Sequence, residues 1–137
     1  MNLDSFIKTH DIMTADDRIS ESMIGDIEAA VGQPLGPQLR DYLLRFGFLL
    51  FEDVEFYGVN IRTLHNSDLV KQTNYLHQYF PKTLNLIAIE NKGEGHYVLV
   101  DSSDFVFDYR SETDELSRTG TTLYEHILSR FQEAQED

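Results

Sequence analysis

The sequence contains no cysteine and no tryptophan, and only three of its 137 residues are proline. Without cysteine, the chain can form no disulfide and offers no thiolate metal ligand or thiol nucleophile. Long apolar runs are also absent: the longest, residues 46–51, is far too short to cross a bilayer. Residues 1–17 lack the basic segment and apolar run of a signal peptide. We therefore expect a cytoplasmic protein.

Basic residues are scarce. Eleven Lys and Arg stand against 24 Asp and Glu, which gives a formal net charge of −13. A field of this sign repels nucleic acid and anionic lipid, and it attracts basic partners. Selection for solubility alone produces the same excess. The charge therefore predicts no nucleic-acid and no membrane partner, and it leaves open whether the acidic surface itself binds a protein.

The composition is that of a globular protein with a hydrophobic core. Hydrophobic residues make up 41% of the sequence, with nine Phe and seven Tyr. No internal repeat, low-complexity tract or linker divides it. We expect a single domain over residues 1–137.

Apolar residues at the α-helical period predict five helices, one of them short. They are expected at residues 2–10, 19–31, 37–46, 67–80 and 122–131. Gly32 is placed to end the second helix in a left-handed conformation. Pro37 opens the third helix, where a missing N–H has no consequence.

The last two helices carry N-terminal signals of their own. Asn66 or Ser67 is expected to cap the helix of residues 67–80. Thr122 and Glu125, three residues apart, match a capping box in which each side chain satisfies the other residue's N–H.

Strand patterns fall between these helices. One or two short strands are expected within residues 48–59, and three more at 84–90, 96–101 and 105–109. The last three are joined by connections too short for a parallel crossover, so they predict an antiparallel meander. Residues 110–120 are polar and predict a loop. The predicted fold class is α+β: an antiparallel sheet with an N-terminal helix pair, a middle helix and a C-terminal helix packed on it.

No pattern typical of catalysis occurs. Gly93-Glu94-Gly95 lacks the third glycine and the helix of a phosphate loop and predicts a hairpin turn. Asp101-Ser102-Ser103-Asp104 lacks the glycine and distal glutamate of a calcium loop. Hydrogen-bonding or surface roles are expected for the five histidines, none at a local ligand spacing: His10, His65, His77, His96 and His126. We expect no catalytic residue, no metal and no cofactor.

Acidic residues concentrate in two segments. Residues 90–115 contain eight acids and two basic residues, and Glu52, Asp53 and Glu55 form a second cluster. If the strand ending at Tyr57 shares a sheet with the later strands, the two clusters would meet at one edge. Carboxylates interspersed with tyrosines suit a protein partner rich in Lys and Arg. The alternative is that these carboxylates are simply the solvent-exposed polar faces of antiparallel strands and bind no partner. The candidate partner-binding residues are Glu52, Asp53, Glu55, Tyr57, Glu90, Glu94, Asp101, Asp104, Asp108 and Tyr109.

Four segments, together with the amphipathic helix at residues 123–131, resemble one family in their order and spacing. They are IGDIEAAVG (24–32), PLGPQLRDYL (34–43), VEFYG (54–58), and LIAI (86–89) followed by GHYVLVD (95–101). On these the chain resembles the SUKH superfamily, the Smi/Knr-like fold, from residue 19 to 131. It departs from the family pattern in lacking an N-terminal tryptophan and in splitting a Leu-Pro step as Leu35-Gly36-Pro37.

The resemblance implies an immunity protein that binds and neutralises a cognate bacterial toxin domain, in particular a basic nuclease of a contact-dependent or polymorphic toxin system. It implies a monomer when free and a heterodimer with the toxin. No catalytic residues are known for the fold, so the resemblance implies that the protein is not an enzyme.

Two other hypotheses remain at this point. The first is an intracellular scaffold or regulatory module of the Smi/Knr or Syd type without a toxin partner, which a gene neighbourhood with no toxin would favour. The second is a small hydrolase using carboxylates, which a deep pocket holding a buried carboxyl pair would favour.

Overall fold

The computed structural model describes residues 1–59 and 67–136. Within this part of the chain there are five α-helices: α1 (Leu3–Thr9), α2 (Glu21–Val31), α3 (Pro37–Arg45), α4 (Leu69–Tyr79) and α5 (Leu123–Glu136). The strands are β1 (Met13–Thr14), β2 (Leu49–Phe51), β3 (Val54–Phe56), β4 (Ile87–Gly93), β5 (His96–Val100), β6 (Phe105–Arg110) and β7 (Glu115–Thr122). A 3-10 turn, η2 (Pro81–Thr83), precedes β4.

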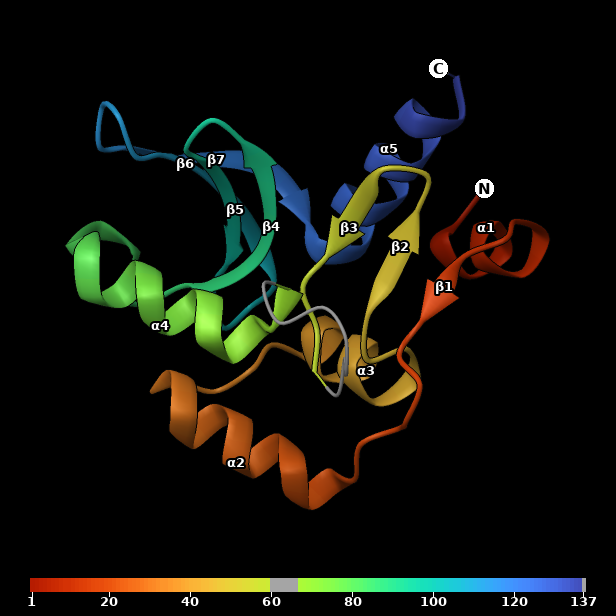
Figure 1. The fold of residues 1–137 in the computed structure, drawn as a ribbon, viewed down its shortest axis with the longest axis horizontal. Helices are drawn as coiled ribbons and strands as arrows, with labels where there is room; N and C mark the ends of the chain where they lie inside the picture. Colours follow the sequence, from red (N-terminus) through yellow and green to blue (C-terminus); the bar gives the residue numbers. More distant parts are fainter. Residues whose placement is uncertain (60–66, 137) are drawn as a thin grey trace.

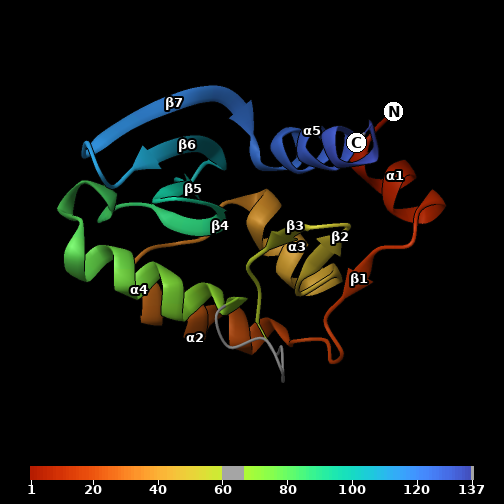
Figure 2. The same cartoon turned by 45° about the horizontal axis from the view of Figure 1, so that its top comes forward.

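The strands form two antiparallel sheets, in the orders β1-β2-β3 and β4-β5-β6-β7. The predicted α+β class and the antiparallel meander are therefore confirmed. The strand that ends at Tyr57 does not share the meander's sheet, yet the Tyr57 N–H donates to the Ile89 carbonyl at 2.8 Å and holds the end of β3 beside β4. α4 runs along the four-stranded sheet, and α5 leads away from β7 towards α1, so that the two termini lie near each other (Figures 1 and 2).

The helix ends follow the predicted stop and start signals in the first half of the chain. Gly32 has a φ of 79°, and its N–H donates to the Glu28 carbonyl at 2.9 Å. α3 begins at Pro37 with Gly36 as its N-cap. α2 starts at Glu21, two residues later than predicted, with Ser20 as its N-cap in an extended conformation.

The cap predicted for α4 is wrong. Its N-cap is Asp68, whose carboxylate accepts the Lys71 N–H at 2.8 Å. Ser67 is buried and donates its hydroxyl to Glu55, while Asn66 lies outside the described residues. At α5, half of the predicted capping box is present, because the Glu125 carboxylate accepts the Thr122 N–H at 2.9 Å.

The prediction of a loop over residues 110–120 is wrong at Arg110, the last residue of β6, and from Glu115 onward, because β7 pairs with β6 from Arg110↔Glu115 to Phe105↔Thr122. Leu116 is the one large apolar residue of this edge strand, so no alternation signals it. Backbone hydrogen bonds and the Arg118 guanidinium, 5.5 Å from each of the Phe105 and Phe107 ring centroids, stabilise the strand instead.

An aromatic cluster joins the chain ends to the three-stranded sheet. The rings of Phe6 in α1 and Phe51 in β2 are 5.3 Å apart, and those of Phe56 in β3 and Phe131 in α5 are 5.6 Å apart. All four side chains are buried. This packing fixes α5 against β3, so that residues of both elements can face one space.

The N-terminus of α3 is capped by a residue far away in sequence. The buried Asp104 carboxylate accepts the Gln38 N–H at 2.8 Å and the Leu39 N–H at 3.0 Å. Gly36 makes room for it, since a Cβ there would lie 2.3 Å from Asp104 Oδ1. Burial raises the pKa of Asp104, although the two N–H donors act in the opposite direction.

We expect Asp104→Ala to lower the free energy of unfolding by about 2 kcal/mol or more, because the half-buried N–H of Gln38 and the buried N–H of Leu39 lose their acceptor. Asp104 also has a φ of 67°, which alanine tolerates poorly. Urea unfolding of Asp104→Asn and Asp104→Gly separates the two causes. Asn keeps an acceptor oxygen and tolerates this φ, so Asp104→Asn should lower the free energy of unfolding least. If Gly is as stable as the native protein, the cap contributes nothing.

Candidate functional site

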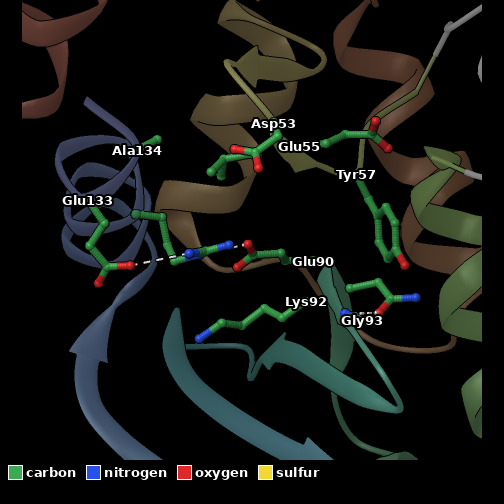
Figure 3. A pocket seen from close by; sticks show the side chains of 11 residues that line it. Asp53, Glu55, Tyr57, Glu90, Lys92, Gly93, Glu133 and Ala134 are labelled. Atoms are coloured by element: carbon green, nitrogen blue, oxygen red, sulfur yellow. Dashed lines mark hydrogen bonds and ion pairs between the residues drawn. The ribbon is translucent and has the colours of Figure 1, made fainter. Parts of the chain in front are cut away.

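A cavity of about 540 Å³ opens where the end of β3, the end of β4 and the last turns of α5 meet. Figure 3 shows the side chains of Asp53, Glu90, Lys92 and Glu133 around this space, with Tyr57 at one side. Its lining combines four carboxylates with two cations: Asp53, Glu55, Glu90 and Glu133, with Lys92 and Arg130. The structure thus brings Glu90, the first acid of residues 90–115, beside Asp53 and Glu55 of the earlier cluster, while the other acids of residues 90–115 do not line the pocket.

A β-bulge places Glu90 at the floor of this pocket. β4 pairs with β5 as Ala88↔Leu99 and then Glu90↔Val98, so Ile89 is the extra residue. Without the bulge, Glu90 would lie opposite Tyr97, on the other face of the strand. The bulge therefore turns Glu90 towards α5 and leaves its side chain only 2% exposed.

Both carboxylate oxygens of Glu90 have partners on α5. His126 Nε2 lies 2.8 Å from Oε1, and Arg130 donates through Nε to Oε2 at 2.8 Å. Arg130 also donates to Glu133 at 3.2 Å. Burial by itself lowers the pKa of Arg130, but the charge and hydrogen bond of Glu90 outweigh it, and the net pKa is raised. Glu90 therefore anchors α5 through both carboxylate oxygens.

The pocket mouth carries the carboxylates of the earlier segment. Asp53 is exposed in the turn between β2 and β3, and Glu55 is half-buried and accepts the Ser67 hydroxyl. Tyr57 is 4% exposed and shares a hydrogen bond with the Asn91 side chain. Burial raises the pKa of Tyr57, with Tyr97 and Glu55 adding to the shift, so the hydroxyl stays protonated. Because Arg130 is paired with the buried Glu90, the remaining carboxylates of Asp53, Glu55 and Glu133 outnumber the one remaining cation, Lys92, and the mouth is acidic.

The other predicted site residues are not brought to this pocket. Glu52 and Glu94 are exposed hairpin-turn residues with φ of 54°. Asp101 accepts the N–H groups of Ser103 and Phe105 at 2.9 and 3.0 Å in its own turn.

Three further candidates serve the fold. Asp104 caps α3, Asp108 lies 3.0 Å from His96 Nε2, and Tyr109 is fully buried with its hydroxyl donating to Asp114. We therefore leave Asp104 and Tyr109 out of the proposed surface.

The prediction from sequence missed the α5 side of the pocket. Arg130 lies within the helix expected over residues 122–131, but only the apolar face of that helix was singled out, and Glu133 lies beyond its expected end. His126 was expected only to form a hydrogen bond or to lie at the surface. The signal that could have found them is the spacing of His126 and Arg130, four residues apart, which places two cation-capable groups on one helix face. Their partner in the structure is Glu90, the carboxylate that directly follows the apolar run of residues 86–89.

The histidines have hydrogen-bonding roles, as predicted. His10 lies 2.9 Å from the Phe6 carbonyl and His77 lies 2.7 Å from the Leu86 carbonyl, while His96 and His126 contact Asp108 and Glu90. His65 is outside the described residues. Across residues 1–59 and 67–136, the structure groups no three His, Asp or Glu side chains in a way that could hold a metal ion.

The fold and this pocket define a small α+β domain whose acidic pocket is held between two sheets and a C-terminal helix. The family model SUKH_5, described as SMI1-KNR4 cell-wall, matches residues 4–132, and the chain therefore belongs to the SUKH family. The resemblance inferred from the segment order is confirmed. The family consists of immunity and Smi/Knr-type binding modules that are generally non-catalytic. No curated protein gives a significant match to the chain.

Among the helices in the described ranges, none has the length and apolar character needed to span a membrane.

Proposed function

We propose that this chain acts as a single domain, in the cytoplasm, as an immunity protein that binds and neutralises a basic toxin domain. The observation that carries the proposal is the acidic pocket formed by β3, β4 and α5 in a member of the SUKH family. Acids from three distant parts of the sequence line it, namely Asp53 and Glu55, Glu90, and Glu133, and the chain as a whole carries a formal net charge of −13.

The proposed contact surface is the rim of this pocket. Asp53, in the turn between β2 and β3, and Glu133, on α5, are exposed carboxylates that line it, and Glu55 lies between Asp53 and Tyr57 in the sequence. A Lys or Arg side chain of the partner entering the pocket would meet these carboxylates while Glu90 stays paired with α5. Steering by the acidic field would speed capture, and the effect would decline with salt.

The direct test is protection of a cell. The C-terminal domain encoded by the gene immediately upstream is expressed in a host with and without this chain, and survival is measured. We expect survival only with this chain and a one-to-one complex of the two purified proteins. Death of the host despite a folded chain would refute the proposal.

The pocket rim is tested by charge reversal. We expect Asp53→Lys with Glu133→Lys to lower the association rate constant about tenfold or more at low salt and to flatten its salt dependence. The matched control is Asp16→Lys with Glu112→Lys, two exposed acids outside the pocket lining that change the net charge equally. Stopped-flow mixing with the same toxin domain measures both. Equal losses in the two variants would show that only the overall charge matters.

A second candidate is a Smi/Knr-type binding module without a toxin partner. It is favoured by the description of the matching family model, SMI1-KNR4 cell-wall. The two functions predict different gene neighbourhoods: an adjacent gene ending in a toxin domain supports immunity, and its absence favours the binding module.

A further inference from the structure

A tyrosine pair lies exposed on α4, outside the pocket. Tyr75 and Tyr79 are 45% and 58% exposed, and their ring centroids are 5.1 Å apart. They are four residues apart and therefore project from the same helix face. Leu84, just beyond η2, is also 58% exposed.

A continuous line of contacts connects this pair to the buried sheet. The Tyr75 ring lies 6.3 Å from Phe80, and Phe80 lies 5.6 Å from Tyr109. Tyr109 is paired with Tyr97 across β5 and β6. The half-buried Tyr97 therefore stands on the same face of the sheet as the residues that contact α4.

Tyr97 in turn connects to the pocket. It is directly opposite Asn91 on β4, and Asn91 shares a hydrogen bond with the Tyr57 hydroxyl at the pocket edge. The pKa of Tyr97 is raised by its burial and, secondarily, by Tyr75, which is consistent with the two side chains being neighbours. Tyr97, Tyr75 and Tyr79 are called the tyrosine strip below, which meets the pocket at Tyr57, itself only 4% exposed.

Elsewhere in the described chain, two arginines lie over phenylalanine rings. Arg45 lies 4.7 Å from the Phe46 ring centroid, and Arg118 covers Phe105, whose exposure of 43% is close to that of Tyr75. Within residues 1–59 and 67–136, no Arg or Lys stacks on Tyr75 or Tyr79. No Arg or Lys in the described ranges covers these two ring faces, so a cation of a partner can stack on them. Tyrosine faces attract guanidinium groups, and Arg stacks on them better than Lys because it is planar.

We propose that the tyrosine strip extends the acidic pocket into one surface that binds an arginine-rich segment of a protein partner. One cationic side chain enters the pocket between Asp53 and Glu133, and the next ones stack on Tyr75 and Tyr79. This deepens the proposed function and rests on it for the partner's identity. The occupant follows from charge complementarity, since carboxylates and open aromatic faces both favour cations.

The test uses a peptide, so that it does not depend on a toxin. An eight-residue peptide of alternating Arg and Ser and its Lys–Ser counterpart are titrated by calorimetry into the full chain. We expect the Arg peptide to bind about threefold or more tightly than the Lys peptide. Tyr75→Ala with Tyr79→Ala should weaken the Arg peptide about fivefold and remove the preference for Arg.

Phe105→Ala is the matched control, because it deletes an equally exposed ring outside the strip, and it should leave both affinities unchanged. Ring proton resonances of Tyr75 and Tyr79 should shift with the Arg peptide. Equal affinity for the two peptides, or an unchanged affinity in the tyrosine variant, would overturn the inference. If the chain binds the Arg peptide but not the toxin domain, the proposed function is refuted and the inference about the tyrosine strip is supported.

Discussion

Gly58→Ala should lower the free energy of unfolding by at least about 3 kcal/mol, among the largest effects of any single substitution in this chain. A Cβ at Gly58 would lie 1.8 Å from the Gly47 carbonyl oxygen and 2.9 Å from the Phe48 Cα. Both are backbone atoms, so no side chain can rotate away to relieve the overlap.

The backbone around Gly58 cannot shift without losing hydrogen bonds. Its N–H donates to the Ser67 carbonyl at 2.9 Å, and its own carbonyl accepts the Leu69 N–H at 2.8 Å. The Val59 N–H donates to the Gly47 carbonyl at 3.0 Å, which is the atom that the new Cβ would strike. The Tyr57-Gly58 step therefore joins the end of β3 to the loop after α3 and to the start of α4.

Gly25→Ala is the control for this substitution. Gly25 lies within α2 and is exposed, and a Cβ added there would meet no atom within 4 Å. Alanine there should raise the free energy of unfolding by about 0.5–1 kcal/mol, because it has the higher helix propensity. Urea unfolding monitored by circular dichroism measures both variants. A Gly58→Ala protein as stable as the native chain would contradict the packing described here.

Glu90→Gln should have the second large effect, about 3 kcal/mol of lost stability, because removing one partner of a buried ion pair leaves the other charge uncompensated. The Glu90 side chain is 2% exposed, while those of His126 and Arg130 are 10% and 21% exposed. The loss should appear as a lower urea midpoint with an unchanged slope.

A double-mutant cycle separates the ion pair from the packing around it. Glu90→Leu with Arg130→Leu removes both charges, so the double variant should be more stable than the sum of the single losses predicts, by about 1–3 kcal/mol. Asp53→Asn, in the same pocket but exposed, should change stability by less than about 0.5 kcal/mol. Strictly additive losses at Glu90 and Arg130 would show that the two side chains do not act as a pair.

The role of Glu90 shows where sequence reasoning about the site reached its limit. Its position in an acidic segment predicted a surface carboxylate for a partner. Whether a strand carboxylate faces water or a helix depends on the register, and one extra residue in β4 reverses the face. The segment LIAIEN (86–91) contains no signal for the bulge, so the local sequence could not predict that Glu90 pairs with His126 and Arg130.

Asp104 and β7 show the same limit in the fold. Asp104 was predicted as a partner-binding acid, but its carboxylate caps α3, a helix that begins far earlier in the chain, at Pro37. β7 lacks an apolar alternation, because an edge strand needs backbone hydrogen bonds and few buried side chains. Long-range partners of this kind exist only after the elements have assembled.

The sequence by itself determined the α+β class, the places of the helices, the glycine and proline positions that end and begin them, and the family. These are consequences of local period and backbone preference, which act within a few residues. Only the tertiary structure decided that the strands split into two sheets, that Asp53, Glu90 and Glu133 surround one pocket, and that Tyr109 and Asp104 are buried. These depend on contacts between segments tens of residues apart, whose geometry is set by packing and strand register.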